Sequence, residues 1–252
     1  MKYTSTVMLV LLSFISKGQN FEAGLNYLFS IPRGPMQNTI RNANGFSADN
    51  YFTPKGKRYS FGIEMNFNLY GHDKTRQTYT MDNGSKAPMD IVVENSFFNF
   101  MLAGRYYLSE GNIQPYVTGK IGYSFFRTDL MIYDPDDFDH CEPIDADILS
   151  KDGSILVSFG AGLRLDLLPK EKPGRFFLNL STNYSAGGNV DYMNVDVPNN
   201  NQNYATHTSD VYAQFINTQT QVVHAHHVGN VYSSPIELLD FRIGGTFRFG
   251  RE

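Results

Sequence analysis

Apolar and polar residues alternate over several long stretches of the chain, most clearly in Arg58–Gly71. The odd-numbered positions from Tyr59 to Leu69 are all aromatic or aliphatic, whereas the even-numbered positions from Ser60 to Asn68 are small or polar. A period of two residues places the two kinds of side chain on opposite faces of an extended strand. The pattern therefore predicts a β-strand with one apolar and one polar face.

The final stretch, Ile236–Phe249, shows the same alternation with a charged polar face. Phe241 and Phe247 share one parity, and Asp240 and Arg242 share the other. Stretches of this kind predict strands at residues 21–30, 45–53, 58–71, 89–108, 113–128, 154–168, 175–192 and 236–249. We expect an all-β protein whose last strand closes the sheet against the first.

The connections between these strands alternate between long and short. The short ones are expected at residues 54–57, 109–112 and 169–174, and the long ones include residues 72–88, 131–152 and 193–235. Short turns on one side and longer loops on the other are typical of barrels in bacterial outer membranes. The pattern predicts an eight-stranded antiparallel up-and-down transmembrane β-barrel with short periplasmic turns and long extracellular loops.

The N-terminus has the features of a secretory signal. Lys2 precedes the apolar run Val7–Ser16, which is shorter than the roughly 20 residues of a membrane-spanning helix. Gly18 supplies a small residue before an expected cut near Gln19. We therefore expect a signal peptide at residues 1–18, a barrel domain at residues 19–252 and export to the cell outer membrane.

Composition excludes several other classes of protein. The formal net charge of −4 gives no basic excess for binding nucleic acid, and a single cysteine cannot form an intramolecular disulfide. The mean hydropathy of −0.33 is too polar for a helical membrane protein.

The charged parity is expected to face the lumen of the barrel. Lys or Arg at the lipid-facing midplane costs about 2–4 kcal/mol per residue, and buried charges must pair with one another. The predicted lumen charge network consists of Glu64, Arg105, Lys120, Arg164, Asp166, Asp240, Arg242 and Arg248. The inverse arrangement, with the apolar rows inside, would be a soluble lipocalin-like calyx.

Four stretches carry a family resemblance: Arg58–Gly71, Ile113–Phe126, Phe159–Asp166 and the terminal Gly-Gly-Thr-Phe-Arg-Phe. Together they resemble the eight-stranded outer-membrane β-barrel proteins of Bacteroidetes-type bacteria, which share their architecture with OmpA/OmpX barrels. The resemblance covers nearly the whole mature chain. It implies an outer-membrane location without catalytic residues or a cofactor. It also implies contact with outer-membrane lipid and lipopolysaccharide, and with other outer-membrane proteins.

Two loop segments contain residues that can bind metals. Clustered carboxylates suit hard cations such as Ca²⁺, and histidines suit transition metals. The candidate ligands are Asp134, Asp136, Asp137, Asp139, His224 and His226. The spacing and glycine of an EF-hand loop are absent from the acidic segment, so we favour ordinary solvated loops.

One segment bears on enzymatic activity. Asn183–Gly188 loosely resembles the His-x-Ser stretch of outer-membrane lipid A deacylases, but Asn183 stands where the histidine base would be. We therefore expect a non-enzymatic barrel with a structural or surface-interaction role, including that of an accessory subunit in a secretion or assembly complex. A lipid-modifying outer-membrane enzyme is the alternative.

The signal sequence generates the first testable prediction. The mature protein should begin near Gln19, because the apolar run is too short to anchor the chain as a helix. N-terminal sequencing of the protein extracted from outer membranes measures this. A chain that retains Met1 in the inner membrane would contradict the assignment.

Overall fold

The computed structural model describes residues 20–80, 86–134, 143–167, 175–194, 205–216 and 223–249. Within them lie one short 3-10 helix, η1 (Gly34–Asn38), and nine strands. The strands are β1 (Asn20–Pro32), β2 (Ala43–Thr53), β3 (Tyr59–Thr80), β4 (Lys86–Tyr107), β5 (Ile113–Tyr133), β6 (Asp145–Asp166), β7 (Arg175–Asn194), β8 (Thr206–Ile216) and β9 (Val223–Phe249). Over these ranges, no helix is long and apolar enough to cross a membrane.

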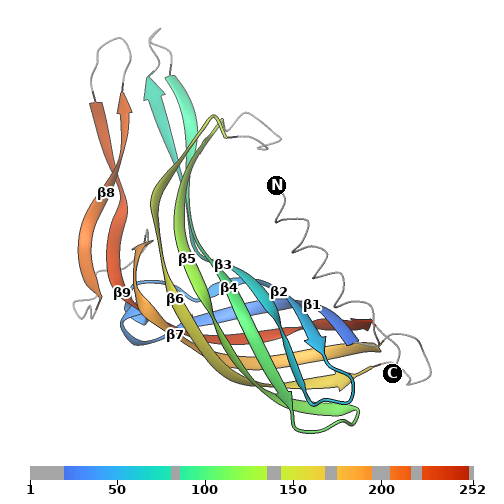
Figure 1. The fold of residues 1–252 in the computed structure, drawn as a ribbon. Coiled ribbons are helices and arrows are strands. Elements are labelled where there is room, and N and C mark those ends of the chain that lie inside the picture. The colour runs from blue at the N-terminus through green and yellow to red at the C-terminus, as the bar shows by residue number, and fades with distance from the viewer. Residues whose placement is uncertain are drawn as a thin grey trace, which may run out of the picture.

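The sheet closes on itself through antiparallel pairing of β1 with β9. The register runs from Phe21 opposite Phe249 to Pro32 opposite Leu238. The other barrel strands follow in the order β1-β2-β3-β4-β5-β6-β7-β9 (Figure 1). This confirms the predicted all-β, eight-stranded antiparallel barrel and its closure by the last strand.

The two ends of the barrel differ. At the end that we call the turn end lie the start of β1, the end of β9 and the tight connections at residues 54–57 and 109–112. The opposite end, which we call the ribbon end, carries long strand extensions that rise well beyond the barrel (Figure 1). The described short and long connections are therefore segregated, as the spacing of the strands predicts, whereas the predicted turn at residues 169–174 lies outside the described residues.

Apolar side chains cover the outer wall of the barrel. Leu102, Ile121 and Phe159 are 57%, 55% and 68% exposed, and each of the eight barrel strands adds large apolar side chains to this surface. Soluble monomers rarely expose contiguous apolar patches of more than a few hundred Å². The charged side chains of the barrel strands are buried in the lumen instead, so the inverse calyx arrangement does not occur.

The lumen has two layers. Towards the turn end it contains charged and amide side chains, described below. Towards the ribbon end it is filled by an apolar cluster that includes Met36 and Ile40 from the β1–β2 connection. The rings of Phe97 and Phe126 stack there with centroids 5.1 Å apart, beside Tyr70. This apolar cluster is absent from the sequence-based prediction of a charged lumen.

Three segments predicted as loops form strands. Most of residues 72–88 extends the β3–β4 ladder, and residues 131–152 contain the end of β5 and the start of β6. Residues 193–235 contain β8 and the first part of β9. The backbone pairs here as it does in the barrel, but both faces are mostly polar, so the period of two residues disappears.

These extensions form two units. The outer sheet comprises Gly71–Thr80 of β3, Lys86–Asn95 of β4, Thr128–Tyr133 of β5 and Asp145–Ile155 of β6. The outer hairpin comprises β8 and Val223–Ser233 of β9. β8 pairs only with β9 among the described residues, so it lies outside the barrel ladder.

The outer hairpin should be dispensable for folding. Asn194 of β7 lies opposite Asn230 of β9, so an Asn-Gly turn can join them once residues 195–229 are removed. We expect the shortened chain to insert and fold, because all eight barrel strands keep their partners. Gel mobility before and after boiling, together with a urea titration, checks this. Failure of the shortened chain to fold would show that the hairpin is part of the barrel's stability.

Candidate functional site

A buried carboxylate at Glu64 in β3 pairs with three of the predicted lumen cations. Arg105 Nη2 lies 3.2 Å from its Oε1, and Lys120 Nζ lies 2.6 Å from its Oε2. Arg242 also donates to Oε2, and the hydroxyl of Tyr51 donates to Oε1 at 2.6 Å. One acid therefore holds together side chains from β2, β3, β4, β5 and β9 across the lumen.

Aromatic rings complete the environment of Arg105. Its guanidinium lies 3.6 Å from the centroid of the Tyr51 ring and 5.1 Å from that of Tyr116. Such cation–π contacts stabilise a cation that has left water. Gly162 makes room for Tyr116, because a Cβ at that position would clash with the ring.

A second cluster surrounds Glu22 of β1, nearer the turn end. Arg164 Nη1 lies 2.7 Å from Oε2, and Arg248 Nη2 lies 2.6 Å from Oε1. Arg164 also donates to the side chains of Gln114 and Tyr107. Two guanidiniums thus share one fully buried carboxylate.

The structure divides the eight predicted lumen residues among four places. Glu64, Arg105, Lys120 and Arg242 meet in one cluster, while Arg164 and Arg248 meet at Glu22. Asp240 instead accepts hydrogen bonds from Ser30 and Ser185. Asp166 pairs with Arg175 at the edge of the barrel.

Three charged residues of these clusters are missing from the prediction: Glu22, Asp49 and Arg175. Asp49 is buried within 3.5 Å of Arg105 and accepts a hydrogen bond from Asn26. Glu22 and Asp49 both lie on the polar parity of their strands, so the alternation already placed them in the lumen. Arg175 shares the parity of Asn179 and Ser181 in its strand, so the alternation points it inward as well.

The segment compared with deacylases lies inside the barrel. Asn183 is buried in the lumen, and Ser185 next to it hydrogen-bonds Ser158 at 3.0 Å and Asp240 at 3.2 Å. Neither side chain reaches the apolar outer wall of the barrel.

The structure describes few of the candidate metal ligands. Asp136, Asp137 and Asp139 lie outside the described residues, as do the side chains of His224 and His226. Asp134 is described and follows the end of β5. Across the described part of the chain, no group of three His, Cys, Asp or Glu side chains could hold a metal ion.

Ion pairs and a small apolar cluster stiffen the outer sheet. Arg76 and Lys74 of β3 both bind the carboxylate of Asp90 in β4, at 2.6 and 2.8 Å. Hydrogen bonds from Arg76 and from Lys74 hold the pKa of Asp90 well below its usual range. On this sheet, Ile91, Val93 and Leu130 form a cluster against which Leu149 of β6 and Val228 of the outer hairpin pack.

Three strand edges at the ribbon end have no partner strand among the described residues. β2 leaves β3 after Leu69, so Gly71–Thr80 is paired on one side only. β7 leaves β6 at Leu156, which exposes the edge of Asp145–Ile155. β8 is unpaired along the whole side that faces away from β9. Each edge presents unpaired backbone donors and acceptors.

The chain matches no protein-family model and no curated protein. Among solved structures, it is similar to Neisserial surface protein A, NspA, with 11% identity, a TM-score of 0.44, and coverage of 93% of this chain and 98% of that chain. A major outer membrane protein from Thermus thermophilus gives 11% identity and a TM-score of 0.47, covering 92% and 99%. Ail, the attachment invasion locus protein of Yersinia pestis, is 12% identical with a TM-score of 0.38. The match covers 92% of this chain and 99% of that chain. At these values, we draw no functional argument from the comparisons.

The Glu64 cluster predicts unequal effects of two neighbouring substitutions. Arg242→Leu should destabilise the barrel by about 3–5 kcal/mol, because it leaves Glu64 buried with one cation fewer. Phe241→Leu removes only part of a ring that is 43% exposed on the outer wall, so its effect should be much smaller. Urea midpoints of the refolded variants in lipid vesicles measure the difference. Equal midpoints would contradict a structural role for the cluster.

The filled lumen predicts a silent channel. Eight strands enclose an interior just wide enough for side chains, and here charged clusters and the apolar cluster occupy it. Planar-bilayer recording of the purified protein should show no stable conductance. Reproducible steps of porin size would contradict a closed lumen.

Proposed function

We propose that this protein is an integral outer-membrane barrel whose role is non-enzymatic surface interaction, carried by the outer sheet and the outer hairpin. The observation that carries the proposal is the combination of a filled lumen with three unpaired strand edges beyond it. A filled lumen has no path for a transported solute. The role of the barrel is therefore to anchor the outer sheet and the outer hairpin.

The apolar outer wall supports the membrane location. All eight barrel strands expose apolar side chains there, and every strand has a partner on both sides within the barrel. These are the two requirements for a β-structure in hydrocarbon. The partners of this wall are outer-membrane lipid and the acyl chains of lipopolysaccharide.

The segregation of the connections sets the orientation. Outer-membrane barrels place short turns in the periplasm and longer segments outside. The turn end therefore faces the periplasm, and the ribbon end faces the medium. A signal peptide at residues 1–18 would deliver the chain to this membrane.

Strand addition is the interaction that the edges favour. An extended segment of another protein can pair with an exposed strand edge through its backbone. Natural edges are protected by charged residues, especially lysine, and by proline. The β3 edge carries Lys74 and Arg76 and the β6 edge carries Lys151, whereas β8 contains no Lys, Arg or Pro. β8 is therefore the least protected of the three edges.

The partner that we propose is another outer-membrane or surface protein, including a larger secretion or assembly complex of which this chain would be an accessory subunit. The apolar packing of Val228 against the outer sheet holds the hairpin in one place. A fixed edge loses less entropy on pairing than a mobile one.

The lipid-modifying alternative has less support. The burial of Asn183 and Ser185 inside the lumen separates them from lipid, and Asn183 cannot act as a general base. Comparison of lipid A mass spectra from deletion and wild-type cells tests this alternative directly. A change in acylation would favour the enzyme.

Site-specific cross-linking tests the interaction. In a Cys141→Ser background, Ser209→Cys places a photo-activated cross-linker on the exposed β8 edge, and Asn112→Cys places it at the turn end as a control. We expect a protein adduct in native outer membranes at Ser209→Cys that is absent at Asn112→Cys. Absence of an adduct at Ser209→Cys, or the same adduct at both positions, would contradict interaction through β8.

A further inference from the structure

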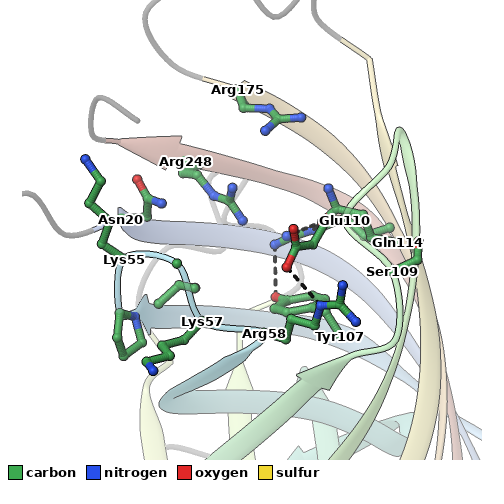
Figure 2. Close-up of a pocket in the computed structure, with 14 residues that line it drawn as sticks. Asn20, Lys55, Lys57, Arg58, Tyr107, Ser109, Glu110, Gln114, Arg175 and Arg248 are labelled. Atoms are coloured by element: carbon green, nitrogen blue, oxygen red, sulfur yellow. Dashed lines mark hydrogen bonds and ion pairs between the residues drawn. The ribbon is translucent and has the colours of Figure 1, made fainter.

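A cavity of about 400 Å³ opens at the turn end of the barrel, apart from the outer sheet and outer hairpin (Figure 2). It lies between the β2–β3 turn, the β4–β5 turn and the adjoining ends of β1, β6, β7 and β9. Its charged lining residues are Lys55, Lys57, Arg58, Glu110, Arg164, Arg175 and Arg248. This volume is within the range of small-molecule sites, roughly 300–1,000 Å³.

The cationic side chains become less exposed with depth. Arg58 on the turn is 51% exposed, Arg175 is 13% exposed, and Arg164 is 2% exposed. Figure 2 shows Lys57 and Arg58 on one side of the cavity and Arg175 and Arg248 on the other. An anion that enters therefore meets cations at the rim and deeper in the wall.

The carboxylates near the cavity do not balance these charges. Six cationic side chains line it, and the acids around them are Glu110, Glu22 and Asp166, so cations exceed carboxylates by three. Each acid is held by an arginine. In the described part of the chain, Lys55 and Lys57 have no carboxylate partner. A concave site with one sign of excess charge concentrates ligands of the opposite sign.

Two polar atoms in the wall are buried without a hydrogen-bond partner in the described structure. They are Thr53 Oγ1 and Asn20 Oδ1. A buried polar group without a partner destabilises the fold, so a ligand that supplies the partner is favoured. The hydroxyl of Thr53 can donate to an anionic oxygen, and the amide oxygen of Asn20 can accept from a ligand hydroxyl. The wall thus offers cations, a donor and an acceptor together.

We propose that this turn-end cavity binds the phosphoryl group of a phosphorylated polyol, with Lys55, Lys57 and Thr53 contacting the phosphate and Asn20 accepting from a neighbouring hydroxyl. Guanidinium and ammonium groups are the usual partners of phosphate oxygens. A phospholipid headgroup and a free phosphate ester share this chemistry. The site adds a second binding function, at the opposite end from the strand edges, and does not depend on them.

Two variants test the site without touching the buried ion pairs. Lys55→Gln/Lys57→Gln removes two exposed cations, and Thr53→Val removes an unpartnered hydroxyl while conserving the shape of the side chain. Arg33→Gln/Lys151→Gln is the control, because it removes the same charge from exposed positions at the ribbon end. Urea midpoints of all variants should match that of the wild type or, for Thr53→Val, exceed it.

In the first arm, calorimetric titration in detergent at constant ionic strength measures the binding of free glycerol 1-phosphate and of inorganic phosphate. A second arm places the protein in vesicles of phosphatidylglycerol or phosphatidylcholine and records ³¹P line broadening. We expect the dissociation constant to rise about tenfold in Lys55→Gln/Lys57→Gln, equivalent to about 1.4 kcal/mol. It should also rise in Thr53→Val and stay unchanged in the control.

The two arms separate the sources of the phosphate. Binding of glycerol 1-phosphate in detergent identifies the ligand as a free phosphate ester. Line broadening in phosphatidylglycerol vesicles alone identifies it as a lipid headgroup. Either result supports the site if the variants weaken the signal. Equal affinity in all variants, an equal response to chloride, or no signal in either arm overturns the proposal.

Discussion

In the outer-membrane location proposed above, hydrocarbon offers no hydrogen-bond partner to a peptide group, and this constraint accounts for the rest of the structure. A sheet with a free edge cannot persist in the bilayer core, so β9 must return to β1. Closure then divides every strand into a face towards lipid and a face towards the lumen. Above the barrel the constraint disappears, and there β3, β6 and β8 leave one edge unpaired.

Closure with eight strands creates a second requirement, because charged side chains now share a narrow interior. The barrel meets it by gathering cations around two buried acids, Glu64 and Glu22, and by filling the remaining lumen with aromatic and aliphatic side chains. Removing one partner from such a cluster destabilises the fold by more than the intact cluster stabilises it. The lumen is therefore a structural element, and binding chemistry moves to the two ends.

Those ends differ in the groups that they offer. The ribbon end presents backbone edges, which suit an extended polypeptide, and the least protected of them is β8. The turn end presents a cavity with excess positive charge, which suits a phosphorylated ligand. A barrel with this division can hold a surface partner on one side of the membrane and a small anionic ligand on the other.

The sequence by itself determined the barrel, its eight strands, its closure and the face that each residue of the clear strands takes, because an apolar outer wall around buried charges requires strict alternation. It could not show the outer sheet or the outer hairpin, since strands in water on both faces need no alternation. Parity also placed Glu22, Glu64 and Arg242 in the lumen without saying which of them meet. That pairing, like the apolar cluster around Phe97, depends on strand stagger and on side-chain reach across the barrel, which only the tertiary structure decided.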